Sequence, residues 1–216
     1  MSGSAIAWSV FGAYAGTSAF LLVFPTLLHC KKKSVVEKRI VHASHRGGSA
    51  EAPENTLHAF RNAVVQGTRM LELDVHLTKD RQVVVHHDAS LLRTTGRAAS
   101  IVELEFSELP PLKETGLQLP SFYHPDGALL QWQKPEGEEG APIRIPLLRE
   151  VFETFPASFI NIDLKGSVPE DDPSRTELRT RVHELIVQHG RQDRTAWGSF
   201  SSTVCEACRE QNPEVH

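Results

Sequence analysis

Leu-Glu-Leu-Asp-Val-His at residues 71–76 and Ile-Asn-Ile-Asp-Leu-Lys at residues 160–165 alternate apolar and polar side chains without a break. Strands of a parallel α/β sheet are covered on both faces, so they normally consist of nearly continuous Val, Ile and Leu. Because successive side chains of a strand point to opposite faces, the polar residues of each stretch share one face. The two stretches therefore predict buried strands whose polar face has a purpose other than packing.

The regions around these stretches repeat one pattern, in which short β-branched runs alternate with amphipathic helical segments. This alternation predicts an α/β fold with a parallel sheet and crossover helices. Strands are expected at residues 39–43, 70–75, 82–86, 159–164 and 195–199. Helices are expected from a cap at Asn55 or Thr56 to Gly67, over 147–155, from a cap at Asp172 to Gly190, and over 203–211.

Residues 91–145 lose this periodicity at several prolines and at a Glu/Gly run, so they are predicted to form an excursion from the fold. No internal repeat and no second hydrophobic core is apparent in the sequence. We therefore expect one domain over residues 38–216.

The N-terminus predicts a membrane anchor. Residues 4–28 contain no Asp, Glu, Lys or Arg, and three lysines follow at 31–33. About 20 mainly apolar residues suffice to cross a bilayer. We expect a transmembrane anchor at 4–29, a basic juxtamembrane linker at 30–37, and a single-pass protein of the endoplasmic reticulum or another endomembrane. A cleaved signal peptide is the alternative, but the positive charges follow the apolar run instead of preceding it.

Composition excludes two other classes of protein. The formal net charge is -4, and no basic cluster with interleaved aromatic residues occurs in the globular part, which argues against nucleic-acid binding. Three cysteines cannot all pair, so the chain is no disulfide scaffold. Cys205 and Cys208 fall within a helical pattern without a second pair, which argues against a zinc or redox site. Nothing in the sequence indicates a protein partner.

The polar faces of the two deciding strands carry three carboxylates. Glu72 and Asp74 are two residues apart and hence about 7 Å apart along one face, and Asp163 shares its face with Asn161 and Lys165. Burying three carboxylates without compensation costs several kcal/mol each. A divalent cation is one natural compensation. A buried ion pair between Lys165 and one carboxylate is the other, and the spacing alone leaves both open.

Two histidines follow predicted strands. His45 comes after the first strand and His87 after the third, where barrel strands deliver side chains to the catalytic face. His86 and His87 have opposite strand parity, so one of the two should point into the site.

Five motifs occur in a fixed order, and the series resembles that of the glycerophosphodiester phosphodiesterase family. They are His-Arg-Gly at 45–47, Pro-Glu-Asn-Thr at 53–56, Glu-Leu-Asp at 72–74, His-Asp at 87–88 with Arg-Thr-Thr at 93–95, and Asn-Ile-Asp-Leu-Lys at 161–165. The anchor and the stretch 145–152 resemble the membrane-anchored subgroup that acts as lysophospholipase D.

This resemblance implies a TIM barrel and a phosphoric diester hydrolase acting on glycerophosphodiesters or lysophospholipids. It implies that Glu72, Asp74 and Asp163 bind one divalent cation, Mg²⁺ or Ca²⁺. His45 and His87 would serve as general acid and base, and His87 is also assigned to the metal because neutral imidazole is a competent ligand. Arg46 and Lys165 would hold the phosphate oxygens. The nucleophile is either water or a neighbouring hydroxyl of the substrate.

Two features depart from the family pattern. The position of Asp163 is more commonly Glu in the family, which leaves the choice of cation open. Residues 38–216 are fewer than the roughly 250 of a complete TIM barrel. We therefore expect a C-terminally incomplete barrel with about five of eight strands, unstable or inactive alone. A catalytically inactive, membrane-tethered remnant is the alternative function. A phosphoinositide-cleaving phospholipase C on a similar barrel is disfavoured by the motifs at 53–56 and 72–74.

Overall fold

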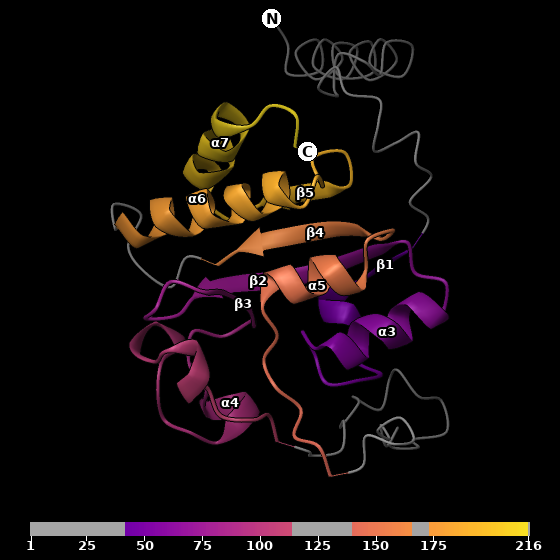
Figure 1. Ribbon diagram of the computed structural model, residues 1–216, viewed down its shortest axis with the longest axis vertical. Helices are drawn as coiled ribbons and strands as arrows, with labels where there is room; N and C mark the ends of the chain where they lie inside the picture. Colours follow the sequence, from indigo (N-terminus) through magenta and orange to yellow (C-terminus); the bar gives the residue numbers. More distant parts are fainter. Residues whose placement is uncertain (1–41, 114–139, 166–172, 216) are drawn as a thin grey trace, which may run out of the picture. The chain divides into compact units, whose positions relative to one another are not determined.

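The computed structural model describes residues 42–113, 140–165 and 173–215. These residues form a sheet of parallel strands flanked by helices (Figure 1). The parallel strands are β1 (Ala43–Ser44), β2 (Met70–Leu77), β4 (Phe159–Leu164) and β5 (Thr195–Gly198), paired in the order β1-β2-β4-β5. The prediction of an α/β fold with a parallel sheet is confirmed.

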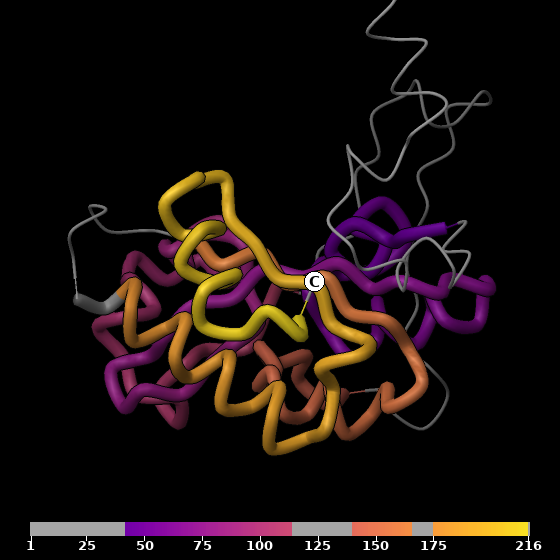
Figure 2. The backbone as a smooth tube through the Cα atoms, turned by 90° about the horizontal axis from the view of Figure 1, so that it is seen from above, coloured from indigo at the N-terminus to yellow at the C-terminus, as the bar shows by residue number. Residues whose placement is uncertain are grey.

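Helices connect successive parallel strands, as the alternating sequence pattern predicts. They are α3 (Leu57–Val65), α5 (Leu148–Thr154), α6 (Pro173–Gln188) and, after β5, α7 (Ser202–Gln211). Of the two candidate caps for α3, Thr56 is the one used, since its hydroxyl accepts a hydrogen bond from the Ala59 amide at 3.1 Å. Figure 2 shows α6 and α7, coloured orange to yellow, next to each other.

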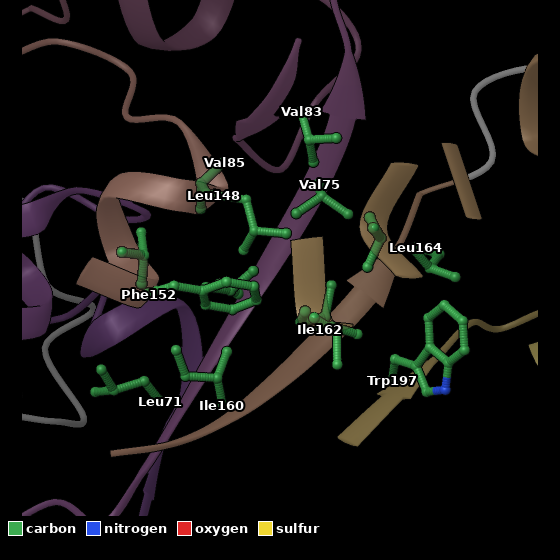
Figure 3. Packing of buried hydrophobic residues seen from close by; sticks show 14 of the residues in the cluster. Leu71, Val75, Val83, Val85, Leu148, Phe152, Ile160, Ile162, Leu164 and Trp197 are labelled. Carbon is green, nitrogen blue, oxygen red and sulfur yellow. The ribbon is translucent and has the colours of Figure 1, made fainter. Parts of the chain in front are cut away.

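The apolar parity of β2 and β4 builds the main core. Leu71 pairs with Ile160 and Leu73 with Ile162 in register, so their side chains leave the sheet on the same face. All four are buried in the main hydrophobic cluster, and Figure 3 shows Leu71, Ile160 and Ile162 within it. The cluster also takes in Phe60 of α3, Leu148 and Phe152 of α5, and Val182 and Ile186 of α6. The polar parity of both strands is thereby turned to the opposite face, toward the site.

The direction of the predicted third barrel strand differs from the prediction. β3 (Val83–Val85) pairs antiparallel with β2, with Val85 opposite Val75 and Val83 opposite Leu77, and lies off the main strand order. The connection over 78–82 is too short for a parallel return, which needs a crossover of a dozen or more residues. All five predicted strands are therefore present in the described sheet, but only four of them run parallel, and β3 forms an antiparallel hairpin with β2.

The expectation of no second hydrophobic core is also wrong. The described part of the excursion forms three short helices, α4 (Leu92–Thr95), η3 (Ile101–Glu103) and η4 (Phe106–Glu108). They bury a separate apolar cluster of Val84, Leu91, Ile101, Leu104, Ile145 and Leu147. Single helical turns carry no readable periodicity, so this cluster is invisible in the sequence pattern. Residues 114–139 of the excursion lie outside the described residues.

The membrane prediction is not addressed by the described residues. Both predicted segments, the anchor at 4–29 and the linker at 30–37, lie outside them. The predicted helix cap at Asp172 lies outside them as well. Among the helices that are described, none combines the length and apolarity needed to cross a bilayer.

Candidate active site

A pocket of about 390 Å³ opens where β2 and β4 deliver their polar side chains, next to the end of β5. All seven residues singled out in the sequence line this one pocket: His45, Arg46, Glu72, Asp74, His87, Asp163 and Lys165. Asn161, Ile162, Gly198, Ser199 and Phe200 complete the lining. The register explains the convergence, since Glu72 lies opposite Asn161 and Asp74 opposite Asp163 on adjacent parallel strands.

Lys165 lies between two of the three carboxylates. Its Nζ is 2.9 Å from Oδ1 of Asp74 and 2.6 Å from Oδ2 of Asp163. Burial acts to lower the pKa of the Lys165 ammonium, but the hydrogen bonds to Asp163 and Asp74 outweigh it and raise the pKa. The ion-pair arrangement left open by the sequence is therefore present, with two carboxylates instead of one.

Asp74 is held on a second side by Asn55. The Asn55 amide nitrogen donates to Oδ2 of Asp74 at 2.8 Å, and its amide oxygen accepts from the Asp74 backbone N–H at 3.4 Å. Both residues are about 1% exposed. Asn55 adopts a left-handed φ of 57°, which asparagine tolerates better than most residues. This role of Asn55 is not predicted from the sequence; because Thr56 alone caps α3, the preceding asparagine is left for another role.

The surroundings of Glu72 disfavour its negative charge. Its Oε2 accepts a hydrogen bond from the Arg46 backbone N–H at 2.7 Å. Burial nevertheless raises the pKa of the Glu72 carboxyl, and the charges of Asp74 and Asp163 raise it further. This end of the pocket therefore favours an additional positive charge.

The donor set suits a divalent cation by chemistry. Glu72, Asp74 and Asp163 present hard carboxylate oxygens to the same pocket, as Mg²⁺ and Ca²⁺ prefer, and the raised pKa of Glu72 points the same way. In their present arrangement, the described residues contain no group of three His, Cys, Asp or Glu close enough to form a ready ligand set. Lys165 instead occupies the space between two of the carboxylates.

Left-handed backbone places the His45–Gly47 turn at the mouth of the pocket. Arg46, Gly47 and Gly48 have φ values of 51°, 76° and 88°. A Cβ on Gly47 would lie 2.7 Å from the Phe60 ring, so only glycine allows the turn to pack on α3. The turn directs Arg46 back toward the strands, where its Nε is 3.6 Å from Oδ2 of Asp74. This Nε is buried and makes no hydrogen bond with any described residue.

The β2–β3 hairpin returns His87 to the pocket. The His86 amide donates to the Asp74 carbonyl at 2.9 Å, which sets the next residue at the level of the carboxylates. Nδ1 of His87 is 2.6 Å from Oδ1 of Asp88, and this contact leaves Nε2 as the ring nitrogen available to a substrate.

Two neighbouring histidines have structural roles. His86 is buried, with Nε2 2.8 Å from the Thr94 hydroxyl, and it does not line the pocket, in agreement with the opposite parity of His86 and His87. His76 Nε2 is 3.0 Å from the His87 carbonyl oxygen. Burial lowers the pKa of His86 and lowers that of His76 to about 4, so both rings are neutral at physiological pH.

Comparison with known proteins agrees with the motif series. The profile of the glycerophosphoryl diester phosphodiesterase family matches residues 45–216. Lysophospholipase D GDPD1 of Rattus norvegicus is 43% identical over 207 residues, covering 96% of this chain and 59% of the relative. Lysophospholipase D GDPD3 of Homo sapiens is 33% identical over 204 residues, covering 94% and 58%. The chain thus spans about three fifths of the length of these relatives.

A solved structure supports the fold. The crystal structure of glycerophosphodiester phosphodiesterase from Agrobacterium tumefaciens has a TM-score of 0.58 and 24% sequence identity, covering 81% of this chain and 64% of that chain. This likeness concerns the fold alone, and it confirms that the described residues adopt a TIM-barrel-like α/β arrangement.

Proposed function

This chain belongs to the glycerophosphoryl diester phosphodiesterase family, and on that basis we propose that it is a phosphoric diester hydrolase acting on lysophospholipids or glycerophosphodiesters. The observation that carries the proposal is the convergence of two histidines, two cations and three carboxylates on one pocket. The names of its lysophospholipase D relatives favour lysophospholipids as the substrate class.

The two cationic side chains suit the phosphodiester oxygens. Arg46 lines the pocket with a buried Nε that forms no hydrogen bond within the described part of the chain. An anionic phosphate oxygen would supply that partner through a charge-assisted hydrogen bond. Lys165, which contacts the other oxygen of Asp74, offers a second positive charge in the same pocket, and both charges would offset the negative charge that grows in the transition state.

The two histidines suit proton transfer. One imidazole would take a proton from the attacking hydroxyl, and the other would donate a proton to the departing alkoxide. Because Asp88 engages Nδ1 of His87, Nε2 is the atom that would exchange the proton. Water and the neighbouring glycerol hydroxyl of the substrate both remain candidates for the nucleophile.

Glu72, Asp74 and Asp163 would hold one divalent cation, Mg²⁺ or Ca²⁺, with His87 as a further candidate ligand. When bound, the cation would polarise a phosphoryl oxygen as a Lewis acid. The carboxylates also form ion pairs with Lys165 and, through Asp74, with Arg46. They therefore orient both phosphate-binding side chains independently of a bound metal.

We propose further that residues 4–29 anchor the protein in an endomembrane, where lysophospholipids are met. Carbonate extraction of membranes from cells expressing the full chain tests this. Retention in the membrane supports the anchor, and release into the supernatant contradicts it.

The function is tested with membranes that carry the full chain and are supplied with lysophosphatidylcholine. We expect choline release that falls at least tenfold in a His45→Ala variant of equal abundance and falls on chelation of divalent cations. Release that survives His45→Ala unchanged would remove the assigned mechanism. Release that depends on His45 and is indifferent to chelator would remove the metal alone.

A non-catalytic membrane-tethered relative is the second candidate. One observation favours it: β1 and β5 each have a single neighbour in the described sheet, whereas every strand of a closed barrel has two. Choline release from the parent chain no greater than from His45→Ala membranes would favour this alternative.

A further inference from the structure

Arg93, from the short helix α4 in the excursion, links two carboxylates with its guanidinium. Its Nε donates to Oδ2 of Asp88 at 2.6 Å, and a terminal nitrogen donates to Oε1 of Glu54 at 2.6 Å. Glu54 and Arg93 are 39 positions apart in the sequence. The planar guanidinium therefore joins the loop before α3 to the loop after β3.

Each of these carboxylates also contacts a residue of the pocket. Oδ1 of Asp88 is 2.6 Å from Nδ1 of His87. Oε1 of Glu54 is 3.3 Å from a terminal nitrogen of Arg46. The result is one continuous chain of alternating groups with Arg93 at its centre, which runs from the proton-transfer histidine to the phosphate-binding arginine.

Within this series of contacts, Arg93 favours the ionised forms of Asp88 and Glu54. The hydrogen bond from Arg93, followed by that with His87, holds the pKa of Asp88 well below its usual range. Burial acts to raise the pKa of Glu54, but the hydrogen bond and charge of Arg93, together with the charge of Arg46, lower it overall. Both carboxylates are therefore ionised at neutral pH and act as hydrogen-bond acceptors only.

We propose that Arg93 is a positioning residue, which fixes the His87 imidazole and the Arg46 guanidinium relative to each other through Asp88 and Glu54. The inference rests on the proposed hydrolase function. An arginine suits this position because its planar guanidinium can engage two carboxylates in one plane. A lysine ammonium is a point charge without fixed directions.

Stability alone is a poor explanation for this contact. The Arg93 side chain is 49% exposed, and ion pairs of exposed residues contribute little to folding. Geometry matters more at a catalytic site, where small displacements of the reacting groups reduce rates strongly. Removal of Arg93 should therefore alter turnover much more than the melting temperature.

Steady-state kinetics of the full chain with lysophosphatidylcholine tests the proposal. In Arg93→Ala we expect kcat to fall roughly tenfold to a hundredfold, with a smaller change in KM and a nearly unchanged melting temperature. Arg93→Lys should restore only part of the rate. The matched control is Arg97→Ala, which removes an exposed arginine of the same segment whose guanidinium donates to the Glu108 carbonyl, outside the chain of contacts. It should leave kcat unchanged.

A double variant tests whether Arg93 acts through Asp88. In an Asp88→Asn background, Arg93→Ala should reduce kcat by less than it does in the parent, because part of its route to His87 is already broken. Full multiplication of the two losses would contradict the proposal.

A spectroscopic measurement separates this inference from the proposed function. In the full chain labelled with ¹⁵N-histidine, the His87 ring signals are identified by their loss in His87→Gln. Arg93→Ala should shift these signals at constant pH, and Arg97→Ala should not. A parent without His45-dependent turnover would overturn the function, whereas an unmoved His87 signal would overturn the inference. Full kcat in Arg93→Ala, with an active parent, would overturn it equally.

Discussion

The pocket has two halves that are built in different ways. One half is carried by β2 and β4, where Asp74 and Asp163 follow the strict alternation of regular strands and Lys165 directly follows the end of β4. The other half is carried by loops, where the His45–Gly47 turn and the segment after β3 supply both histidines and Arg46. The strand half is fixed by the sheet register, and the loop half by left-handed residues and long-range ion pairs. The two halves should therefore fail differently when they are mutated.

The largest effect is expected from a substitution of Asp74 in the strand half. In Asp74→Ala, the Lys165 ammonium and the Asn55 amide lose a buried partner. We expect about 3–5 kcal/mol less free energy of unfolding and no detectable turnover. Denaturant unfolding followed by tryptophan fluorescence measures the loss. Asp74→Asn, which keeps the shape and removes the charge, should lose less stability; an Asp74→Ala protein as stable as the parent would show that the strand half is not held by these contacts.

In the loop half, the largest effect is expected from a substitution of Gly47. Gly47→Ala combines a φ of 76° with a Cβ that would lie 2.7 Å from the Phe60 ring. We expect a loss of about 2–3 kcal/mol and a displaced His45 and Arg46, with reduced turnover. Thermal unfolding and choline release measure both. Gly67→Ala is the matched control, because its φ is 87° and nothing lies within 4 Å of the added Cβ. Equal losses in the two variants would mean that backbone strain alone matters and the contact with α3 does not.

Thr56 tests how far the loop half depends on the helix behind it. Thr56→Ala removes the cap of α3, which accepts from the Ala59 amide and also donates to the Pro53 carbonyl at 2.7 Å. We expect a loss of about 1 kcal/mol, measured by denaturant unfolding. Turnover should fall modestly, because Asn55 next to it orients Asp74. Thr56→Ser keeps the hydroxyl and should behave nearly as the parent; a Ser variant as weak as Ala would point to the methyl group instead of the cap.

The smallest effect is expected at the tip of the β2–β3 hairpin, which sets where His87 returns. The hydrogen bond from the Thr78 hydroxyl lowers the pKa of Asp80 below its ordinary value of 3.8. A lowered folded-state pKa contributes stability above the unfolded pKa, and this stability is lost as the pH falls below about 3.8. The Asp80→Asn variant should therefore be less stable than the parent at pH 6, by well under about 1 kcal/mol for so exposed a group.

The same difference should be smaller at pH 3 than at pH 6, because the stability contributed by a carboxyl with a lowered folded-state pKa is lost as the pH falls below the unfolded pKa. Unfolding curves of both proteins at the two pH values check the sign. A difference that grows as the pH falls would contradict the assigned hydrogen bond.

Sequence reasoning was strongest where the residue pattern is local and regular. Residues 159–164 are predicted as a strand and form one with the same bounds, and the alternation along β2 and β4 identifies which side chains share a face. It failed where elements are short. The antiparallel direction of β3 and the second apolar cluster rest on single turns and a five-residue connection, for which the periodicity gives no signal.

Within the site, the sequence by itself determined the residue types and, through the period of two along a strand, the convergence of Glu72, Asp74 and Asp163 on one pocket. Only the tertiary structure decided that Lys165 lies between two carboxylates, that Asn55 grips Asp74, and that Arg93 joins the two loops. The physical reason is the range of the interactions. Strand parity is set by neighbouring residues, whereas an ion pair between positions 54 and 93 exists only after the chain has brought the two loops together.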